Sequence, residues 1–159
     1  MGNTYTVERS AVIDAPPRRV FPEVANFHRW QTWSPWEDVD PDMRRSYSGA
    51  GAGTGAVYEW SGNRKAGAGR MQITRADEPS LVHVDLRFTK PFKSENDMRM
   101  TFEPEGPTGS QTRVTWTLEG PMTLMTRVMG VFTSMDKLVG PDFEKGLQRL
   151  KAVAESSNS

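Results

Sequence analysis

The most informative segment for the fold is Ser134–Glu155, SMDKLVGPDFEKGLQRLKAVAE, close to the C-terminal end of the chain. Its apolar residues are spaced by three, four and one positions, which places them on one stripe of a helix with 3.6 residues per turn. They are Met135, Leu138, Val139, Phe143, Leu147, Leu150 and Val153. No other part of the chain has so long a helical pattern. A lone helix with one apolar face needs a sheet to cover that face, so the pattern predicts an α+β fold.

The segments that precede this helix alternate between apolar and polar residues, as half-buried strands do. Short connections between successive segments imply antiparallel strands joined mostly by hairpins. After the first strand we expect two short helices. Prolines at 16 and 17 open an amphipathic one that contains Val20 and Phe21, and Trp30 and Trp33 share a face of the second. The predicted strands are 5–13, 57–60, 69–75, 81–89, 94–103 and 112–119, with 43–48 as a plausible seventh at an edge and 104–110 as a turn.

Length and composition restrict the classes of protein that the chain can belong to. A chain of 159 residues with 36% hydrophobic and 25% charged residues fits one polar globular domain, which we expect to span 1–159 with an ordered core at about 5–155. The formal net charge is zero, so we expect no nucleic-acid partner. No stretch is apolar for the roughly 20 residues of a membrane span, so we expect no stable membrane insertion. The absence of cysteine suits a cytoplasmic location.

Several short motifs have familiar spacings that we interpret as structural. Gly51-x-Gly53-x-x-Ala56 fits a dinucleotide fingerprint, but a strand follows it where that motif requires a helix. The three aspartates between 38 and 42 lack the glycine and glutamate of a calcium loop. His83 falls on the polar side of a strand, and His28 has no serine, cysteine or carboxylate that the sequence places beside it. We therefore predict no catalytic residue, no metal site and no cofactor.

The order of strand, short helices, strand meander and long C-terminal helix resembles the START-like superfamily, from about Tyr5 to Glu155. The motifs that carry the resemblance are Ala15-Pro16-x-x-x-Val20-Phe21, Trp30-x-x-Trp33-Ser34-Pro35-Trp36, Gly55-x-x-Tyr58-x-Trp60, Gly109-x-x-Thr112-x-Val114-x-Trp116 and Phe143-Glu144-Lys145-Gly146-Leu147-x-x-Leu150-Lys151. Within that superfamily, the chain looks similar to the birch-pollen-allergen-like proteins and most of all to bacterial polyketide cyclase/dehydrase-like, or SRPBCC, proteins.

The resemblance implies a helix-grip fold, in which about seven curved antiparallel strands wrap the long helix and enclose an apolar cavity. Alternation along the strands then selects the side chains that face this cavity, and the linker before the helix adds two methionines. Nine methionines in one short chain suit a pocket that adapts to apolar ligands. The predicted ligand-binding residues are Trp33, Trp36, Tyr58, Trp60, Leu86, Phe88, Asn96, Met98, Met100, Phe102, Trp116, Leu118, Met125, Met129, Met135, Leu138, Val139 and Phe143.

Some of these assignments have two interpretations. Asn96 either orients a ligand or is solvated at the end of a strand. The tryptophans at 30, 33 and 36 either close one end of the pocket or pack the short helices onto the sheet. For any single methionine or ring in the set we favour packing in a core, and for the set as a whole we favour a cavity, because the resemblance implies one.

Three functions fit this pattern, because a shared fold does not settle the chemistry. The first is binding of a small apolar molecule that is lipid-like, polyketide-like or aromatic. The second is a cyclase/dehydrase-type enzyme that acts on a polyketide-like or aromatic substrate held in shape by the same cavity. The third is a protein-interaction module, which an exposed apolar patch would favour. We favour the first, and the sequence leaves the ligand and the oligomeric state open.

Overall fold

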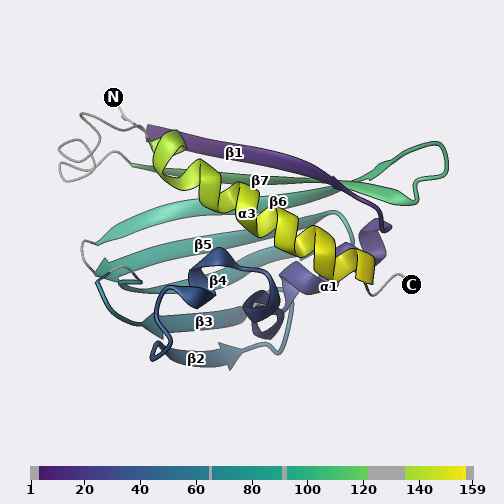
Figure 1. Cartoon of the computed structure of the whole chain (residues 1–159). Helices are drawn as coiled ribbons and strands as arrows, with labels where there is room; N and C mark the ends of the chain where they lie inside the picture. Colours follow the sequence, from purple (N-terminus) through teal and green to yellow (C-terminus); the bar gives the residue numbers. More distant parts are fainter. Residues whose placement is uncertain (1–3, 65, 91–92, 122–134, 157–159) are drawn as a thin grey trace.

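One antiparallel sheet curves around the C-terminal helix in the computed structural model, which describes residues 4–64, 66–90, 93–121 and 135–156 (Figure 1). Within those residues the sheet has seven strands in the order β1-β7-β6-β5-β4-β3-β2, so β1 and β2 are its edges. The elements are β1 (Thr4–Ile13), α1 (Pro17–Ala25), the 3-10 helices η1 (Phe27–Thr32) and η2 (Pro35–Asp38), β2 (Arg44–Gly49), β3 (Ala56–Ser61), β4 (Ala68–Asp77), β5 (Leu81–Lys90), β6 (Ser94–Glu105), β7 (Gln111–Pro121) and α3 (Met135–Ser156).

This architecture confirms the predicted helix-grip fold, including the edge strand at β2. Several predicted strands end two residues too early, since β4 continues to Asp77 and β7 to Pro121. The predicted turn from Pro104 to Ser110 is shorter, because β6 continues through Pro104, which pairs with Thr112 on β7. Proline fits there because its fixed φ is compatible with extended backbone. The chain reverses instead between Gly106 and Gly109, which both have positive φ angles that glycine adopts without strain.

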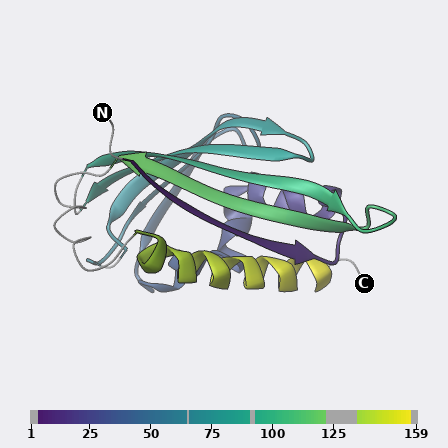
Figure 2. The same cartoon turned by 90° about the horizontal axis from the view of Figure 1, so that it is seen from above.

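The long helix packs its apolar stripe against the sheet. Figure 2 shows α3 lying along the sheet beside β1. Phe143, Leu147 and Leu150 are buried, as the spacing predicts. The approach is close at Gly146, where an added Cβ would lie 2.9 Å from Trp116 and 3.0 Å from Pro35. A glycine at this position therefore lets the helix, β7 and η2 meet.

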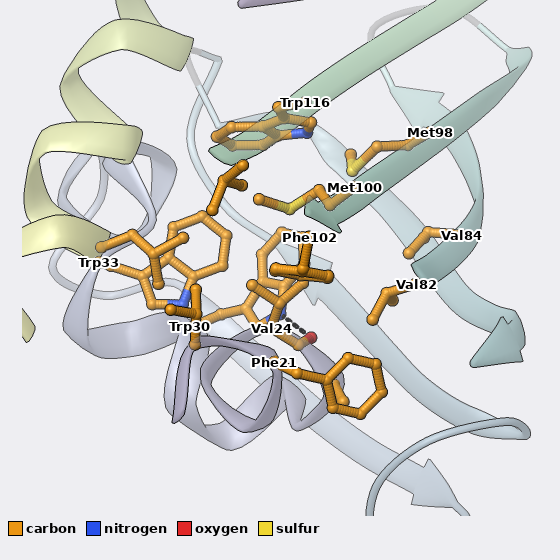
Figure 3. Close-up of a cluster of buried hydrophobic side chains, with 14 of the residues drawn as sticks. Phe21, Val24, Trp30, Trp33, Val82, Val84, Met98, Met100, Phe102 and Trp116 are labelled. Atoms are coloured by element: carbon orange, nitrogen blue, oxygen red, sulfur yellow. Dashed lines mark hydrogen bonds between the residues drawn. The ribbon is translucent and has the colours of Figure 1, made fainter. Parts of the chain in front are cut away.

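Part of the packed core lies on the concave face beneath α1 and η1 (Figure 3), and the buried side chains of α3 add to it. The Trp30 indole donates to the Val24 carbonyl oxygen at 2.7 Å, and the Trp33 indole donates to the Glu23 carbonyl oxygen at 2.9 Å. These bonds tie η1 to α1 and satisfy two buried donors. The core side chains drawn and labelled are Phe21, Val24, Trp30, Trp33, Val82, Val84, Met98, Met100, Phe102 and Trp116.

The outer face of the sheet is polar, as the alternation predicts. His83 is half-exposed there and contacts Asp97 on the next strand, while Arg87 pairs with Asp85 at 2.8 Å. These pairs are solvent-exposed and contribute little to stability. Among the described helices, none is long and apolar enough to cross a membrane.

Candidate functional site

A cavity of about 200 Å³ lies beyond the packed core, between the sheet, the 3-10 segment and α3. Rings, thioethers and aliphatic side chains make up most of its wall. The described residues that line it are Tyr5, Trp30, Ser34, Trp36, Glu37, Met43, Tyr58, Trp60, Ala66, Met71, Leu86, Phe88, Met98, Leu118, Val139 and Phe143.

Half of the predicted ligand-binding set lies in this wall, and the role of these residues in binding stays a prediction. They come from strands β3, β5, β6 and β7, from η2 and from α3, which are far apart in sequence. They are Trp36, Tyr58, Trp60, Leu86, Phe88, Met98, Leu118, Val139 and Phe143.

Four predicted residues lie instead in the packed core. Trp33, Met100, Phe102 and Trp116 are at most 2% exposed and do not line the cavity. Alternation along the strands correctly places Met100, Phe102 and Trp116 on the concave face, whereas Trp33 lies at the end of η1. Alternation does not reveal what covers each position, such as the rings of Trp33, Trp36 and Phe143 that pack against Trp116.

For four further residues of the predicted ligand-binding set, the structure does not describe the side chain. Met125 and Met129 lie outside the described residues. The structure gives the backbone of Met135 and Leu138 at the start of α3 but not their side chains. Their predicted role in binding remains a prediction from sequence.

Asn96 is buried rather than solvated, and it is the partner of a cavity residue. Its side-chain oxygen accepts a hydrogen bond from the Tyr5 hydroxyl at 2.6 Å, and its amide nitrogen donates to Ser94 Oγ at 3.1 Å. Gly120 makes room for the pair, because a Cβ there would lie 2.1 Å from Asn96 Oδ1. The sequence pattern missed this arrangement, since Tyr5 and Asn96 are 91 positions apart.

A second polar cluster consists of Glu37, Arg45 and Tyr58. Arg45 Nε lies 2.6 Å from Glu37 Oε2, and the Tyr58 hydroxyl donates to Glu37 Oε1 at 3.2 Å. The Glu37 side chain is only 7% exposed, so the guanidinium offsets a charge that burial alone would disfavour. Burial, and then the negative charge of Glu37, raise the pKa of Tyr58 far above its ordinary value.

The tryptophans at 30, 33 and 36 combine the two roles that the sequence left open. Trp30 and Trp33 pack in the core with ring centroids 4.6 Å apart, although Trp30 also touches the cavity. Trp36 lines the cavity and meets Phe143 edge-on at 5.9 Å.

The sequence analysis did not select Tyr5, Ser34, Glu37 or Met43 as site residues. Tyr5 lies two residues before Val7 and so on the same, inward face of the strand, and this alternation could have identified it. Glu37 gives none, because a single carboxylate after a Pro-Trp pair looks like an ordinary surface residue. Its place in the wall follows from the 3-10 turn that Pro35 begins.

The histidines do not join the site. His28 is exposed and stacks on Tyr47 with ring centroids 3.9 Å apart, and it does not line the cavity. Within the described part of the chain, no group of three or more histidine, aspartate or glutamate side chains is placed to hold a metal ion.

The buried tyrosines predict how stability responds to alkaline pH. Burial raises the pKa of Tyr5 to about 12, so between pH 10 and 12 the unfolded chain loses the Tyr5 proton while the folded chain keeps it. The stabilisation is fully present below pH 10 and is lost as the pH rises through 12. Tyr5→Phe should therefore show a shallower fall in unfolding free energy across this window, measured by urea denaturation at stepped pH. Parallel pH profiles for the two proteins would contradict the prediction.

The fold, with its apolar cavity between the sheet and α3, defines a START-like protein of the helix-grip type. Residues 4–155 match the family model described as polyketide cyclase / dehydrase and lipid transport, so the chain belongs to that family. No functionally curated protein shows a significant match to the chain.

Solved structures of low sequence identity share the fold. Norcoclaurine synthase from Thalictrum flavum, in complex with dopamine and hydroxybenzaldehyde, is 9% identical with a TM-score of 0.73, covering 99% of this chain and 90% of that chain. A protein from Thermus thermophilus is 17% identical with a TM-score of 0.67, covering 98% and 100% of the two chains. One from Chromobacterium violaceum is 14% identical with a TM-score of 0.65, covering 94% and 96%. At these identities the likeness shows the fold alone.

Proposed function

We propose that the chain binds a small apolar ligand, containing one or two rings, in the cavity between the sheet and α3. The observation that carries this proposal is the cavity wall itself. Aromatic and thioether side chains such as Trp36, Phe88 and Met98 form most of it. Rings and thioethers offer apolar contact area to a ligand, and a few polar groups in such a wall fix its orientation.

The volume supports a compact ligand. A dry protein cavity of about 150 Å³ accepts benzene, so about 200 Å³ suits one or two fused rings better than a diacyl lipid. Norcoclaurine synthase, which shares the fold, was crystallised with two small aromatic molecules. The family description includes lipid transport and cyclase chemistry, and both require an apolar interior.

A cyclase-type enzyme acting on a polyketide-like or aromatic substrate is the second candidate. One observation favours it: Glu37 lines the cavity, and a carboxylate can accept a proton from a bound substrate. Turnover of such a substrate that Glu37→Gln abolishes would identify an enzyme. Saturable binding without turnover would favour the carrier function.

Binding is tested by titrating the purified chain with naphthalene and following tryptophan fluorescence, since three tryptophans line the cavity. We expect saturation at one molecule per chain. Val139→Phe, which adds a ring to the half-buried cavity position on α3, should weaken binding by about tenfold or more, because the ligand and the new ring compete for the same space.

Ala152→Phe is the matched control, because Ala152 is exposed on the same helix and does not line the cavity. It should bind naphthalene like the unmodified chain. Absence of saturable binding, or equal binding by both variants, would remove the proposal.

A further inference from the structure

We infer that the preferred ligand carries a neutral hydroxyl group, phenolic or alcoholic, that donates a hydrogen bond at the Glu37–Tyr58 end of the cavity. This inference rests on the binding function proposed above and adds the chemical class of the ligand. It follows from which hydrogen-bonding positions of the wall are already used and which are open.

The Glu37 carboxylate has open acceptor positions. An ionised carboxylate offers about four lone-pair positions and no proton. In the structure Tyr58 Oη uses one, at 3.2 Å, and Arg45 Nε uses another, at 2.6 Å. Glu37 lines the cavity, whereas Arg45 does not. The ligand therefore meets the carboxylate from the side on which only acceptor positions remain.

The two tyrosines of the wall also present acceptors. The Tyr58 hydroxyl is the donor in its bond to Glu37, whose carboxylate also pairs with Arg45. The amide nitrogen of Asn96 donates to Ser94, which leaves the amide oxygen to accept from Tyr5. Both phenolic protons are thus committed, and the oxygens can only accept.

Two indole N–H groups of the wall already donate to backbone carbonyl oxygens and so are not open to a ligand. Trp60 Nε1 donates to the Ala66 carbonyl oxygen at 2.9 Å, and Trp30 Nε1 donates to Val24. Ser34 and Trp36 keep an O–H and an N–H for a second polar group, such as a ligand carbonyl. Next to the Glu37 carboxylate oxygens and Tyr58 Oη, a ligand acceptor would face oxygen lone pairs, and an unpaired buried polar group is unfavourable.

The charges of Glu37 and Arg45 also restrict the chemical class of the ligand. A ligand carboxylate would meet the Glu37 carboxylate, and the neighbouring cation is already paired. A ligand ammonium would lose its hydration, and the Glu37–Arg45 pair has no net charge to compensate it. A neutral hydroxyl forms the hydrogen bond without either penalty.

The experiment compares four probes of matched size at neutral pH: naphthalene, 2-naphthol, 2-methoxynaphthalene and 2-naphthoate. We expect 2-naphthol to bind about tenfold more tightly than 2-methoxynaphthalene, as one hydrogen bond to a charged acceptor provides. 2-Naphthoate should bind most weakly. Equal affinities for 2-naphthol and 2-methoxynaphthalene, or a preference for 2-naphthoate, would overturn the inference.

Two variants assign the preference to the cluster. In Glu37→Gln the amide can donate to Tyr58 Oη and release the phenolic proton toward the ligand, so the ratio between 2-naphthol and 2-methoxynaphthalene should fall toward one. Tyr58→Phe removes the second acceptor oxygen, Tyr58 Oη, and should also reduce the ratio. Glu144→Gln is the control, since Glu144 is an exposed carboxylate on α3 that pairs with Arg9, and its ratio should be unchanged.

The outcomes separate the two proposals. If naphthalene itself does not bind, the binding function fails and the inference fails with it. If all neutral probes bind equally well, the cavity binds apolar ligands without the hydroxyl preference, and only the inference is wrong. A preference that persists in both Glu37→Gln and Tyr58→Phe also overturns it.

Discussion

Trp116→Ala is expected to lower the free energy of unfolding by about 3–5 kcal/mol, the range seen when a fully buried large ring is truncated. Trp116 on β7 is completely buried. Its ring stacks on Phe143 of α3 with centroids 4.0 Å apart and an interplanar angle of 4°. It also meets Trp33 and Trp36 edge-on, at 5.5 and 5.7 Å. Truncation would therefore remove the contact between helix, sheet and 3-10 segment at once.

The size of this effect is measured by urea denaturation followed by circular dichroism. Trp116→Phe is an informative second variant, because Trp116 Nε1 is buried without a hydrogen-bond partner among the described residues. Phenylalanine keeps a ring in the stack and removes that unsatisfied donor. Trp116→Phe should therefore lower the free energy of unfolding by much less than Trp116→Ala. Thr115→Ala on the opposite face of β7 should change stability by less than about 0.5 kcal/mol. A loss below about 1 kcal/mol for Trp116→Ala would contradict the packing described here.

The same stack shows why the fold could be predicted from sequence. The stripe on α3 and the alternation along the strands each specify one buried face, and a helix with one apolar face and a sheet with one apolar face have a single way to satisfy both. Phe143 and Trp116 were placed on those faces by spacing alone. Their contact follows once the faces meet.

The position of the cavity could not be predicted in this way. Met98 and Met100 are two residues apart on β6 and share a face, yet Met98 lines the cavity and Met100 is in the core. The difference depends on where α1 and η1 rest on the sheet, which is a tertiary property. Periodicity identifies the face of a strand and not what covers each position along it.

The hydrogen-bonding groups of the site could not be predicted from the sequence, for a related reason. The hydrogen bonds of Glu37 are made with Arg45 and Tyr58, and the Tyr5 hydroxyl donates to Asn96. These contacts join different elements, so they exist only in the folded chain. No local pattern distinguishes a carboxylate that will be buried beside an arginine from one that stays in solvent. The apolar character of the site was therefore predictable, and its hydrogen-bonding character was not.

Gly69→Ala is expected to destabilise the chain by about 2–3 kcal/mol, within the range for overpacking a filled site, and to weaken ligand binding at the same time. Gly69 pairs with Trp60 on β3 and with Phe88 on β5. An added Cβ would lie 2.4 Å from the Arg87 carbonyl oxygen and 2.5 Å from Trp60 Cη2. The backbone contact cannot relax without shifting a strand, and the ring contact relaxes only if Trp60 moves toward the cavity.

Gly51→Ala provides the control for this prediction, because Gly51 has open space around its Cβ position and no positive φ. There the methyl group should be neutral or slightly stabilising, since it only restricts the unfolded chain. Urea denaturation measures the first effect, and naphthalene titration measures the second. Equal stability of the two variants would show that Gly69 is not closely packed. Lower stability with unchanged naphthalene affinity would show that the strand shifts while Trp60 stays in place. The cavity wall would then not depend on the packing of Trp60 against Gly69.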